Sequence, residues 1–213
     1  KQKTAYEIHE RLVGSEMCIR DRGKGRSKLK IGHFGTLDPF ASGLLLVGTG
    51  KAMRLTEYIH QSLKKEYEAL GVLGIRTLTG DGDGEVVERR EEGLSASTIR
   101  ETFDSFPKDY MQKPSYFSAV KHLGKPLYEY ARKGVFIDKD PVQRFIYSLN
   151  YLGHQGSQHS FSCSVSTGTY IRALWEDICA KVDNIGHLKG LRRTKIGQLS
   201  VNDASKLTSI SCY

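Results

Sequence analysis

The chain has few cysteines, and their arrangement excludes two kinds of stabilised fold. Its 213 residues contain four cysteines, which lie far apart and form no Cys-x-x-Cys pair. We therefore expect free thiols of a reducing compartment and no disulfide framework. A metal site is not expected either, because none of the seven histidines lies at ligand spacing from a cysteine.

Long apolar runs are also missing. The longest lies near Leu44–Val47, far short of the roughly 18 residues that cross a bilayer. The amino terminus has no signal-peptide core. With 38% hydrophobic and 26% charged residues, the composition is typical of a globular chain. We expect a cytoplasmic protein with no membrane partner.

Charge is unevenly distributed along the chain. Lys and Arg exceed Asp and Glu by 13 to 6 in residues 1–65 and by 14 to 7 in residues 111–213, whereas residues 66–110 have 5 against 11. Two basic regions that converge in space could hold a polyanion such as a nucleic acid. A well-solvated surface explains the same charges, so this pattern leaves both interpretations open.

Hydrophobic periodicity predicts short helices and strands in mixed order. Helices are expected at residues 4–12, from about 51, at 95–104, at 124–133 and from about 170. Alternation predicts strands at 65–75 and after a turn at Gly80–Gly84, and a strand that delivers Thr169–Arg172 to a helix start. Because no steady βαβ alternation appears, the pattern favours an α+β domain on a largely antiparallel sheet.

Residues 13–22 fit no periodicity and resemble translated sequencing-adapter sequence, so no function is assigned to them.

Three glycine-rich patterns resemble ligand loops, but each lacks a required residue. A phosphate loop ending at Gly50–Lys51 would need a hydroxyl at Ala52 to hold magnesium. A calcium loop starting at Asp81 would need glycine where Val86 stands. A dinucleotide fingerprint over the same turn would need glycine at Glu85. No cofactor of these kinds is expected.

One motif, HFGTLDP at residues 33–39, suits catalysis. The ring of Pro39 directs the backbone of Asp38 away from helix, so the carboxylate projects from a fixed turn. That geometry suits a nucleophile. An aspartate that only caps its own turn is the alternative that the motif by itself leaves open.

The sequence resembles the bacterial tRNA pseudouridine synthases that modify the T-loop uridine, the TruB family. The likeness extends over nearly all of residues 28–201. The matching stretches come in the order KIGHFGTLDPFASGLLLVGTGKAMRLTEYI, KEYEALGVLGIRTLTGDGDGEV, QKPSYFSAVKHLGKPLYEYARKG, CSVSTGTYIRALWEDI and GHLKGLRRTKIG.

This resemblance implies a fold and a reaction. The expected fold is the pseudouridine synthase fold, a largely antiparallel mixed sheet flanked by helices and loops, with residues 1–213 as one catalytic domain. Many members carry a small carboxy-terminal RNA-binding domain, which we expect to be absent or truncated in a chain that ends at Tyr213. The implied reaction isomerises uridine to pseudouridine in the T-loop of tRNA without cofactor or metal, in a monomeric protein.

By similarity, three residues carry the chemistry. Asp38 is implied as the nucleophile that attacks or stabilises the electron-poor sugar once the N-glycosidic bond breaks. Tyr67 is expected to lie against the flipped base and to assist proton removal from its carbon. Arg172 matches the arginine that pairs with the carboxylate and holds it ionised and aimed.

Four further residues are implied to contact the substrate or its supports. His33 matches the histidine that supports the loop from which the uridine is flipped. Tyr170 would line the uracil pocket, and Leu191 would close its apolar side. Asp81 matches an acidic position expected to orient Arg172 or to make loop contacts.

Phosphate contacts are assigned to Arg192, Arg193 and Lys195, which would give salt-sensitive affinity without sequence readout.

Two alternatives to the T-loop isomerase remain. One is a tRNA-binding folding factor that opens and reanneals the tRNA elbow without catalysis. The other is a relative that modifies RNA within a guide-RNA complex, against which the bacterial-type stretches RTLTGDGDG and LYEYARKG speak.

Overall fold

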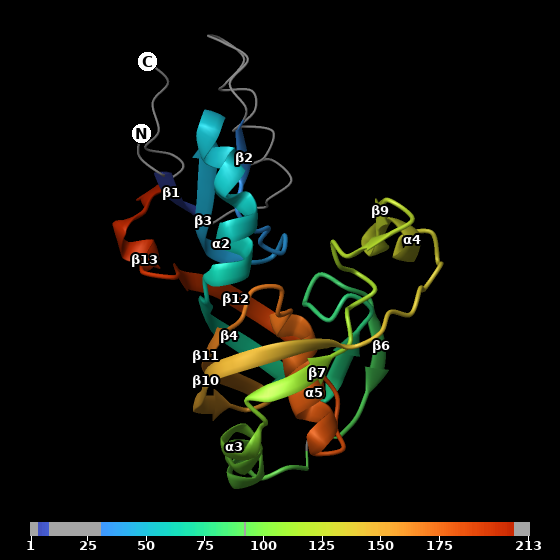
Figure 1. Cartoon of the computed structure of the whole chain (residues 1–213). Coiled ribbons are helices and arrows are strands. Elements are labelled where there is room, and N and C mark those ends of the chain that lie inside the picture. Colours follow the sequence, from blue (N-terminus) through green and yellow to red (C-terminus); the bar gives the residue numbers. More distant parts are fainter. Residues whose placement is uncertain (1–3, 9–30, 92, 207–213) are drawn as a thin grey trace.

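The computed structural model describes residues 4–8, 31–91 and 93–206 of the chain (Figure 1). Most strands belong to one sheet. They are β1 Thr4–Ile8, β2 Ile31–His33, β3 Ser42–Thr49, β4 Lys65–Leu73, β7 Asp109–Gln112, β10 Val142–Gln155, β11 Gln158–Val165, β12 Gly186–Ile196, β13 Leu199–Ser200 and β14 Ser205–Lys206.

Two hairpins and several helices surround this sheet. The hairpins are β5 Ile75–Thr77 with β6 Val86–Arg89, and β8 Lys121–His122 with β9 Lys125–Pro126. The helices are α2 Thr56–Ser62, α3 Ala96–Ser105, α4 Leu127–Ala131 and α5 Ile171–Lys181, with 3-10 turns η1 Gly50–Leu55 and η2 Val201–Asp203. In Figure 1, β9 and α4 stand away from the sheet on an arm.

The sheet is mixed and largely antiparallel, as the sequence predicts. Its strands follow the order β14-β1-β3-β12-β4-β11-β10-β7, with β2 beside β3 and β13 beside β12. The parallel neighbours among the described strands are β1 with β14 and β3 with β12. Helices are interspersed irregularly among the strands, and the α+β prediction is confirmed.

The predicted helix at residues 4–12 is wrong where the structure describes it. Residues 4–8 form β1, which pairs antiparallel with β3 so that Tyr6 lies opposite Leu45. The helical prediction depended on a single four-residue spacing. The edge of β3 offers residues 4–8 backbone hydrogen-bond partners, so this segment forms a strand instead. Residues 9–12 and 13–22 lie outside the described part of the chain.

The remaining helix predictions are confirmed with shifted ends. The Ser95 hydroxyl accepts a hydrogen bond from the Thr98 amide and caps α3. Helix α4 is shorter than predicted because Lys125–Pro126 form β9 before it. Helix α5 begins at Ile171, next to the expected start.

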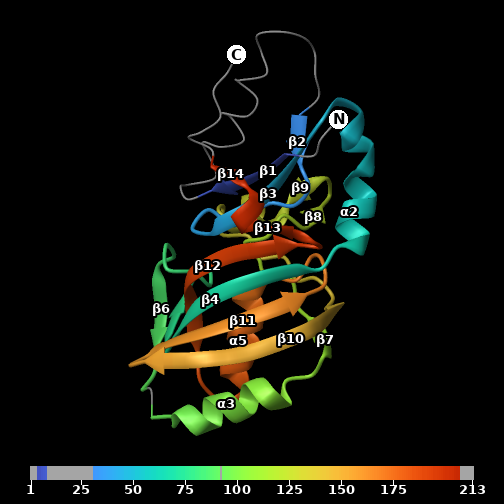
Figure 2. The ribbon, with the colours of Figure 1, turned by 90° about the vertical axis from the view of Figure 1, so that its left-hand side faces the viewer.

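The main core lies between α5, α3 and one face of the sheet. Figure 2 shows α5 behind β4, β11 and β10. Trp175 of α5 is fully buried and stacks on Phe161 of β11 with ring centroids 5.6 Å apart. Gly71 of β4 permits this approach, because a Cβ there would lie 2.3 Å from the Trp175 ring. The same packing fixes α5, whose first turn carries Arg172, against the sheet.

A second buried cluster lies on the other side of β3. Leu44 and Leu46 point into it and pack with Phe34, while Leu45 and Val47 point into the main core. Strand β3 is therefore buried on both faces, which is typical of a strand with a continuous apolar run. Phe34 anchors the start of the loop that precedes β3.

Candidate active site

Asp38 lies in the loop that joins β2 to β3. Phe34 and Leu37 anchor this loop in the two cores, and both are buried. The Ala41 amide donates to the Asp38 carbonyl over 2.9 Å, which closes a turn with Pro39 at its second position. The predicted turn at Asp38–Pro39 is confirmed. In it, 26% of the Asp38 side chain is exposed.

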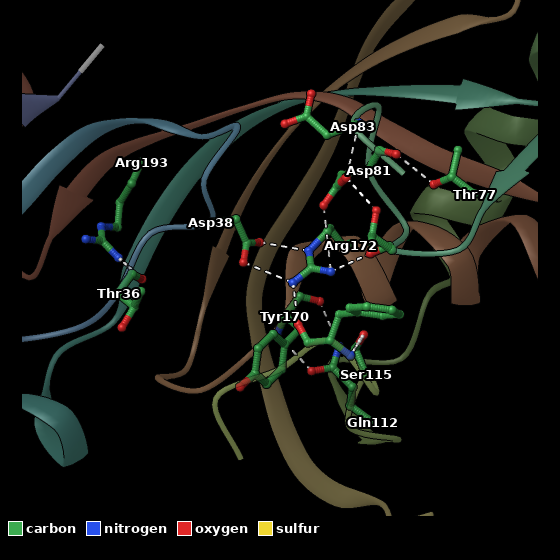
Figure 3. A network of polar contacts seen from close by, with 12 residues as sticks. Thr36, Asp38, Thr77, Asp81, Asp83, Gln112, Ser115, Tyr170, Arg172 and Arg193 are labelled. Atoms are coloured by element: carbon green, nitrogen blue, oxygen red, sulfur yellow. Dashed lines mark hydrogen bonds and ion pairs between the residues drawn. The ribbon is translucent and has the colours of Figure 1, made fainter. Parts of the chain in front are cut away.

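Arg172, in the first turn of α5, holds the Asp38 carboxylate at two points. Its Nε donates to Oδ2 over 2.9 Å, and its Nη2 donates to Oδ1 over 3.0 Å. The Arg172 side chain is only 5% exposed. Its other donors go to the carbonyls of Thr79 and Phe117, so the guanidinium joins three loops (Figure 3). A two-point contact of this kind fixes the direction of the carboxylate as well as its charge environment.

Asp81 lies behind Arg172 as a support. Its Oδ1 accepts hydrogen bonds from the Thr79 hydroxyl over 2.6 Å and from the Asp83 amide over 3.2 Å, while Oδ2 lies 3.9 Å from Arg172 Nη1. Both expected roles, orienting Arg172 and making loop contacts, fit these distances. Burial disfavours the charged guanidinium, but the carboxylates of Asp38, Asp81 and Glu176 outweigh that effect and raise the pKa of Arg172.

Tyr67 and Leu191 come from neighbouring strands and face the same core. Tyr67 of β4 lies opposite Arg193 of β12, and Leu191 lies opposite Ala69. Burial raises the pKa of the Tyr67 phenol, whereas the charge and hydrogen bond of Arg193 lower it. Asp38 is close enough to Tyr67 to contribute to this raised pKa, so the structure brings the two predicted catalytic side chains into one electrostatic environment.

Tyr170 immediately precedes α5, and Gln112 of β7 holds it in place. The Gln112 side chain accepts from the Tyr170 amide over 2.9 Å and donates to its carbonyl over 3.0 Å. Burial raises the pKa of the Tyr170 phenol, and the charge of Asp38 adds to this rise. Gln112 was missed by the sequence reasoning, because no local pattern marks a glutamine that serves a residue so distant in the chain.

His33 ends β2 opposite Val47, directly before the Asp38 loop. Its position is consistent with a residue at the edge of the site. The expected support of a flipped RNA loop stays a prediction.

Arg193 does not lie where a phosphate could reach it, so its predicted role as a phosphate contact is wrong. The residue is 0% exposed. Its guanidinium donates to the carbonyls of Leu44, Thr36 and Gly35 over 2.7, 3.3 and 3.1 Å. Leu191 faces the core, and a side chain two residues further along a strand faces the same way, which is the signal that could have placed Arg193 inside.

Arg192 and Lys195 line a groove of about 630 Å³ on the far side of the sheet, here called the rear groove. Glu66 and Glu68 of β4 also line it, while Tyr67 between them faces the core. Lys195 forms an ion pair with Glu66 over 3.2 Å. The sheet therefore separates these two cations from Asp38.

Among the described residues, no group of three or more His, Cys, Asp or Glu side chains is arranged to hold a metal ion. Within the same residues, every helix is too short or too polar to span a bilayer.

Comparison with known proteins places these residues in a family context. The family model described as "TruB family pseudouridylate synthase (N terminal domain)" matches residues 23–171. A protein of Hydrogenovibrio crunogenus named tRNA pseudouridine synthase B is 40% identical over 182 residues, which are 85% of this chain and 60% of that protein. The protein of the same name in Thermosipho melanesiensis is 41% identical over 175 residues, 82% of this chain and 57% of that protein. The chain thus spans about 60% of the length of these relatives.

The fold is also similar to a solved structure titled "Crystal Structure of a Cbf5-Nop10-Gar1 Complex". The similarity has a TM-score of 0.72 at 24% identity and covers 97% of this chain and 52% of that one. At this identity the match shows a shared fold.

Proposed function

The chain belongs to the TruB family of pseudouridylate synthases, and on that premise we propose that it isomerises uridine to pseudouridine in the T-loop of tRNA. The observation that carries this proposal is the two-point contact between Asp38 and Arg172, with Tyr67 and Tyr170 beside it. We also propose that the enzyme is a monomeric, cytoplasmic protein with one catalytic domain.

In the proposed reaction, the bond from the ribose C1′ to N1 of the uracil breaks, and a new bond forms from C1′ to C5. Asp38 attacks or stabilises the electron-poor C1′ while the base turns. The proton that leaves C5 has to be removed, and N1 has to gain one, so the reaction needs no oxidant or reductant. Arg172 keeps the carboxylate aimed throughout, because its donors to Asp38 and to two loop carbonyls restrain it from both sides.

Tyr67 and Tyr170 supply the surroundings of the base. Tyr67 is buried and shares the electrostatic environment of Asp38, so its phenol is the candidate group for proton removal at C5. Tyr170 is fixed by Gln112 at the start of α5 and would line the uracil pocket with Leu191. The target uridine has to leave its stack to reach these groups, and His33 is proposed to support the emptied loop.

The proposal is tested with an unmodified T-stem-loop transcript, the chain as it stands, and base-resolved detection of pseudouridine. Wild-type protein should convert the T-loop uridine, whereas Asp38→Asn should yield no pseudouridine and should bind the transcript about as well as the wild type. Asp104→Asn, an exposed change on α3, is the matched control and should retain activity. Full activity of Asp38→Asn would exclude the catalytic assignment, and a wild type that binds without converting uridine would identify a folding factor.

A further inference from the structure

Arg193 is a fully buried arginine whose hydrogen bonds go to neutral groups. Its Nε, Nη1 and Nη2 atoms each donate a hydrogen bond to a backbone carbonyl. Among the ion pairs of the described residues, none involves Arg193. Burying a cation without a carboxylate partner costs folding free energy. We therefore expect the hydrogen bonds of Arg193 to have a role that an apolar side chain could not fill.

The carbonyls that Arg193 binds lie on both sides of Asp38 in the chain. Gly35 and Thr36 precede the nucleophile, and Leu44 follows it in β3. One guanidinium therefore ties both ends of the Asp38 loop to β12. In the view of Figure 3, Arg193 with Thr36 lies on one side of Asp38 and Arg172 lies on the other.

The same guanidinium reaches the second catalytic residue. Arg193 and Tyr67 are opposite each other in the β12–β4 ladder, so their side chains lie next to each other on the same face of the sheet, and the charge of Arg193 lowers the pKa of the phenol against the larger effect of burial. A single planar guanidinium thus holds the loop of Asp38 from the position next to Tyr67 on the same face of the sheet. Arginine suits this task because its planar guanidinium presents five donors in fixed directions.

Gly35 shows how closely the loop approaches this cation. Its φ is +127°, and a Cβ there would lie 2.9 Å from the Lys65 ammonium and 3.8 Å from Arg193 Nη1. The backbone at Gly35 therefore passes close to the cationic groups of Lys65 and Arg193. Burial, followed by the charge of Arg193, lowers the pKa of Lys65 to about 8.

We propose that Arg193 is a positioning residue: its guanidinium sets the distance between the Asp38 loop and the Tyr67 phenol. The catalytic half of this inference rests on the proposed isomerase function, while its structural half concerns the free protein. Arg193 acts through Asp38 and Tyr67 and has no contact with RNA.

The experiment compares Arg193→Met and Arg193→Lys with the wild type in two assays. The first is steady-state kinetics on the T-stem-loop. The second is hydrogen exchange, followed by mass spectrometry, of segment 34–46 in the absence of RNA. Arg89→Met, an exposed change on β6, is the control for loss of an arginine.

We expect kcat of Arg193→Met to fall by roughly a hundredfold, because small misplacements of reacting groups have effects of that order, while KM changes by less than about threefold. Exchange of segment 34–46 should accelerate in the order wild type, Arg193→Lys, Arg193→Met. Arg193→Lys should recover part of kcat, because the ammonium keeps the charge but can replace only part of the fork. Arg89→Met should match the wild type in both assays.

A rise in KM with unchanged kcat would show that Arg193 binds RNA, and unchanged exchange of segment 34–46 would show that it does not hold the loop. Either result overturns the proposal. If Arg193→Met does not fold, the same two readouts on Arg193→Lys decide. If the wild type makes no pseudouridine, the proposed function fails, and the exchange data still test whether Arg193 holds the loop.

Discussion

The carboxylate of Asp38 and the guanidinium of Arg172 meet across 134 residues of chain, with donor to acceptor distances of 2.9 and 3.0 Å. The contact joins a turn made rigid by Pro39 to the first turn of a helix packed against the sheet. The pair is therefore held in one geometry in the free protein, which is what the proposed isomerisation requires of its nucleophile.

Arg172→Lys should therefore lower kcat by at least about a hundredfold, because an ammonium cannot reproduce two parallel hydrogen bonds and also reach the carbonyls of Thr79 and Phe117. Initial rates of pseudouridine formation under saturating T-stem-loop measure the effect. Arg89→Lys on exposed β6 is the control and should keep the wild-type rate. A kcat within threefold of the wild type would mean that charge alone suffices at this position.

Local signals in the sequence were sufficient for much of this site. The Asp38–Pro39 pair predicts the turn that carries the nucleophile, and the change from alternating to helical spacing near Tyr170 predicts the helix that carries Arg172. The mixed, largely antiparallel sheet also follows from the pattern of strands and helices.

Other features depend on pairings between distant segments, and local patterns do not encode them. Residues 4–8 became a strand because the edge of β3 was open to them. Gln112 supports Tyr170 from another strand. Arg193 resembled a surface cation beside Arg192 until the register of β12 against β4 placed the two on opposite faces.

Gly71→Ala should destabilise the fold by about 2–3 kcal/mol or more, because its methyl group would lie 2.3 Å from the buried Trp175 ring and would displace α5. Equilibrium urea unfolding measures the change. Gly190→Ala is a matched control in β12, since the nearest atom to its methyl group is Leu70 Cβ at 3.5 Å. Equal midpoints for the two variants would show that α5 shifts without cost.

Lys65→Met should stabilise the fold near neutral pH. Burial, and then the charge of Arg193, lowers the pKa of Lys65 from 10.5 to about 8 in the folded state. Below pH 8 the ammonium is charged in both states, so the full cost of burying it is present, about 3 kcal/mol. Between about pH 8 and 10.5 the folded protein sheds this proton first, and wild-type stability rises with pH.

The gain from Lys65→Met is therefore greatest at pH 7 and shrinks toward pH 10, as measured by urea unfolding at several pH values. Lys64→Met changes the neighbouring side chain, which is half exposed, and should show no such trend. A gain from Lys65→Met that is independent of pH would indicate better apolar packing and no relief of a buried charge.

Glu176→Gln should stabilise the fold at alkaline pH and leave it unchanged in acid. Glu176 lies one helical turn after Arg172, and a Cβ on Gly80 would lie 2.8 Å from its Oε1. Burial raises its pKa from 4.5 to about 7, although Arg172 and Arg76 oppose the shift, while Asp177 and Asp81 add to it. A group with a raised folded-state pKa stabilises the fold below its unfolded pKa, and this contribution is lost as pH rises through the folded value.

Wild-type stability should thus lose on the order of 2 kcal/mol between about pH 4.5 and pH 7 through this group, a loss that the amide variant cannot show. The difference between the two unfolding free energies, measured by urea titration from pH 4 to pH 8, isolates Glu176, because the neighbouring Asp177, whose pKa burial raises to about 6, is present in both proteins. Glu101→Gln on the exposed side of α3 serves as control. Parallel stability curves for the wild type and Glu176→Gln would show that the pKa of this carboxyl is the same in the folded and unfolded states, because Arg172 and Arg76 fully offset its burial.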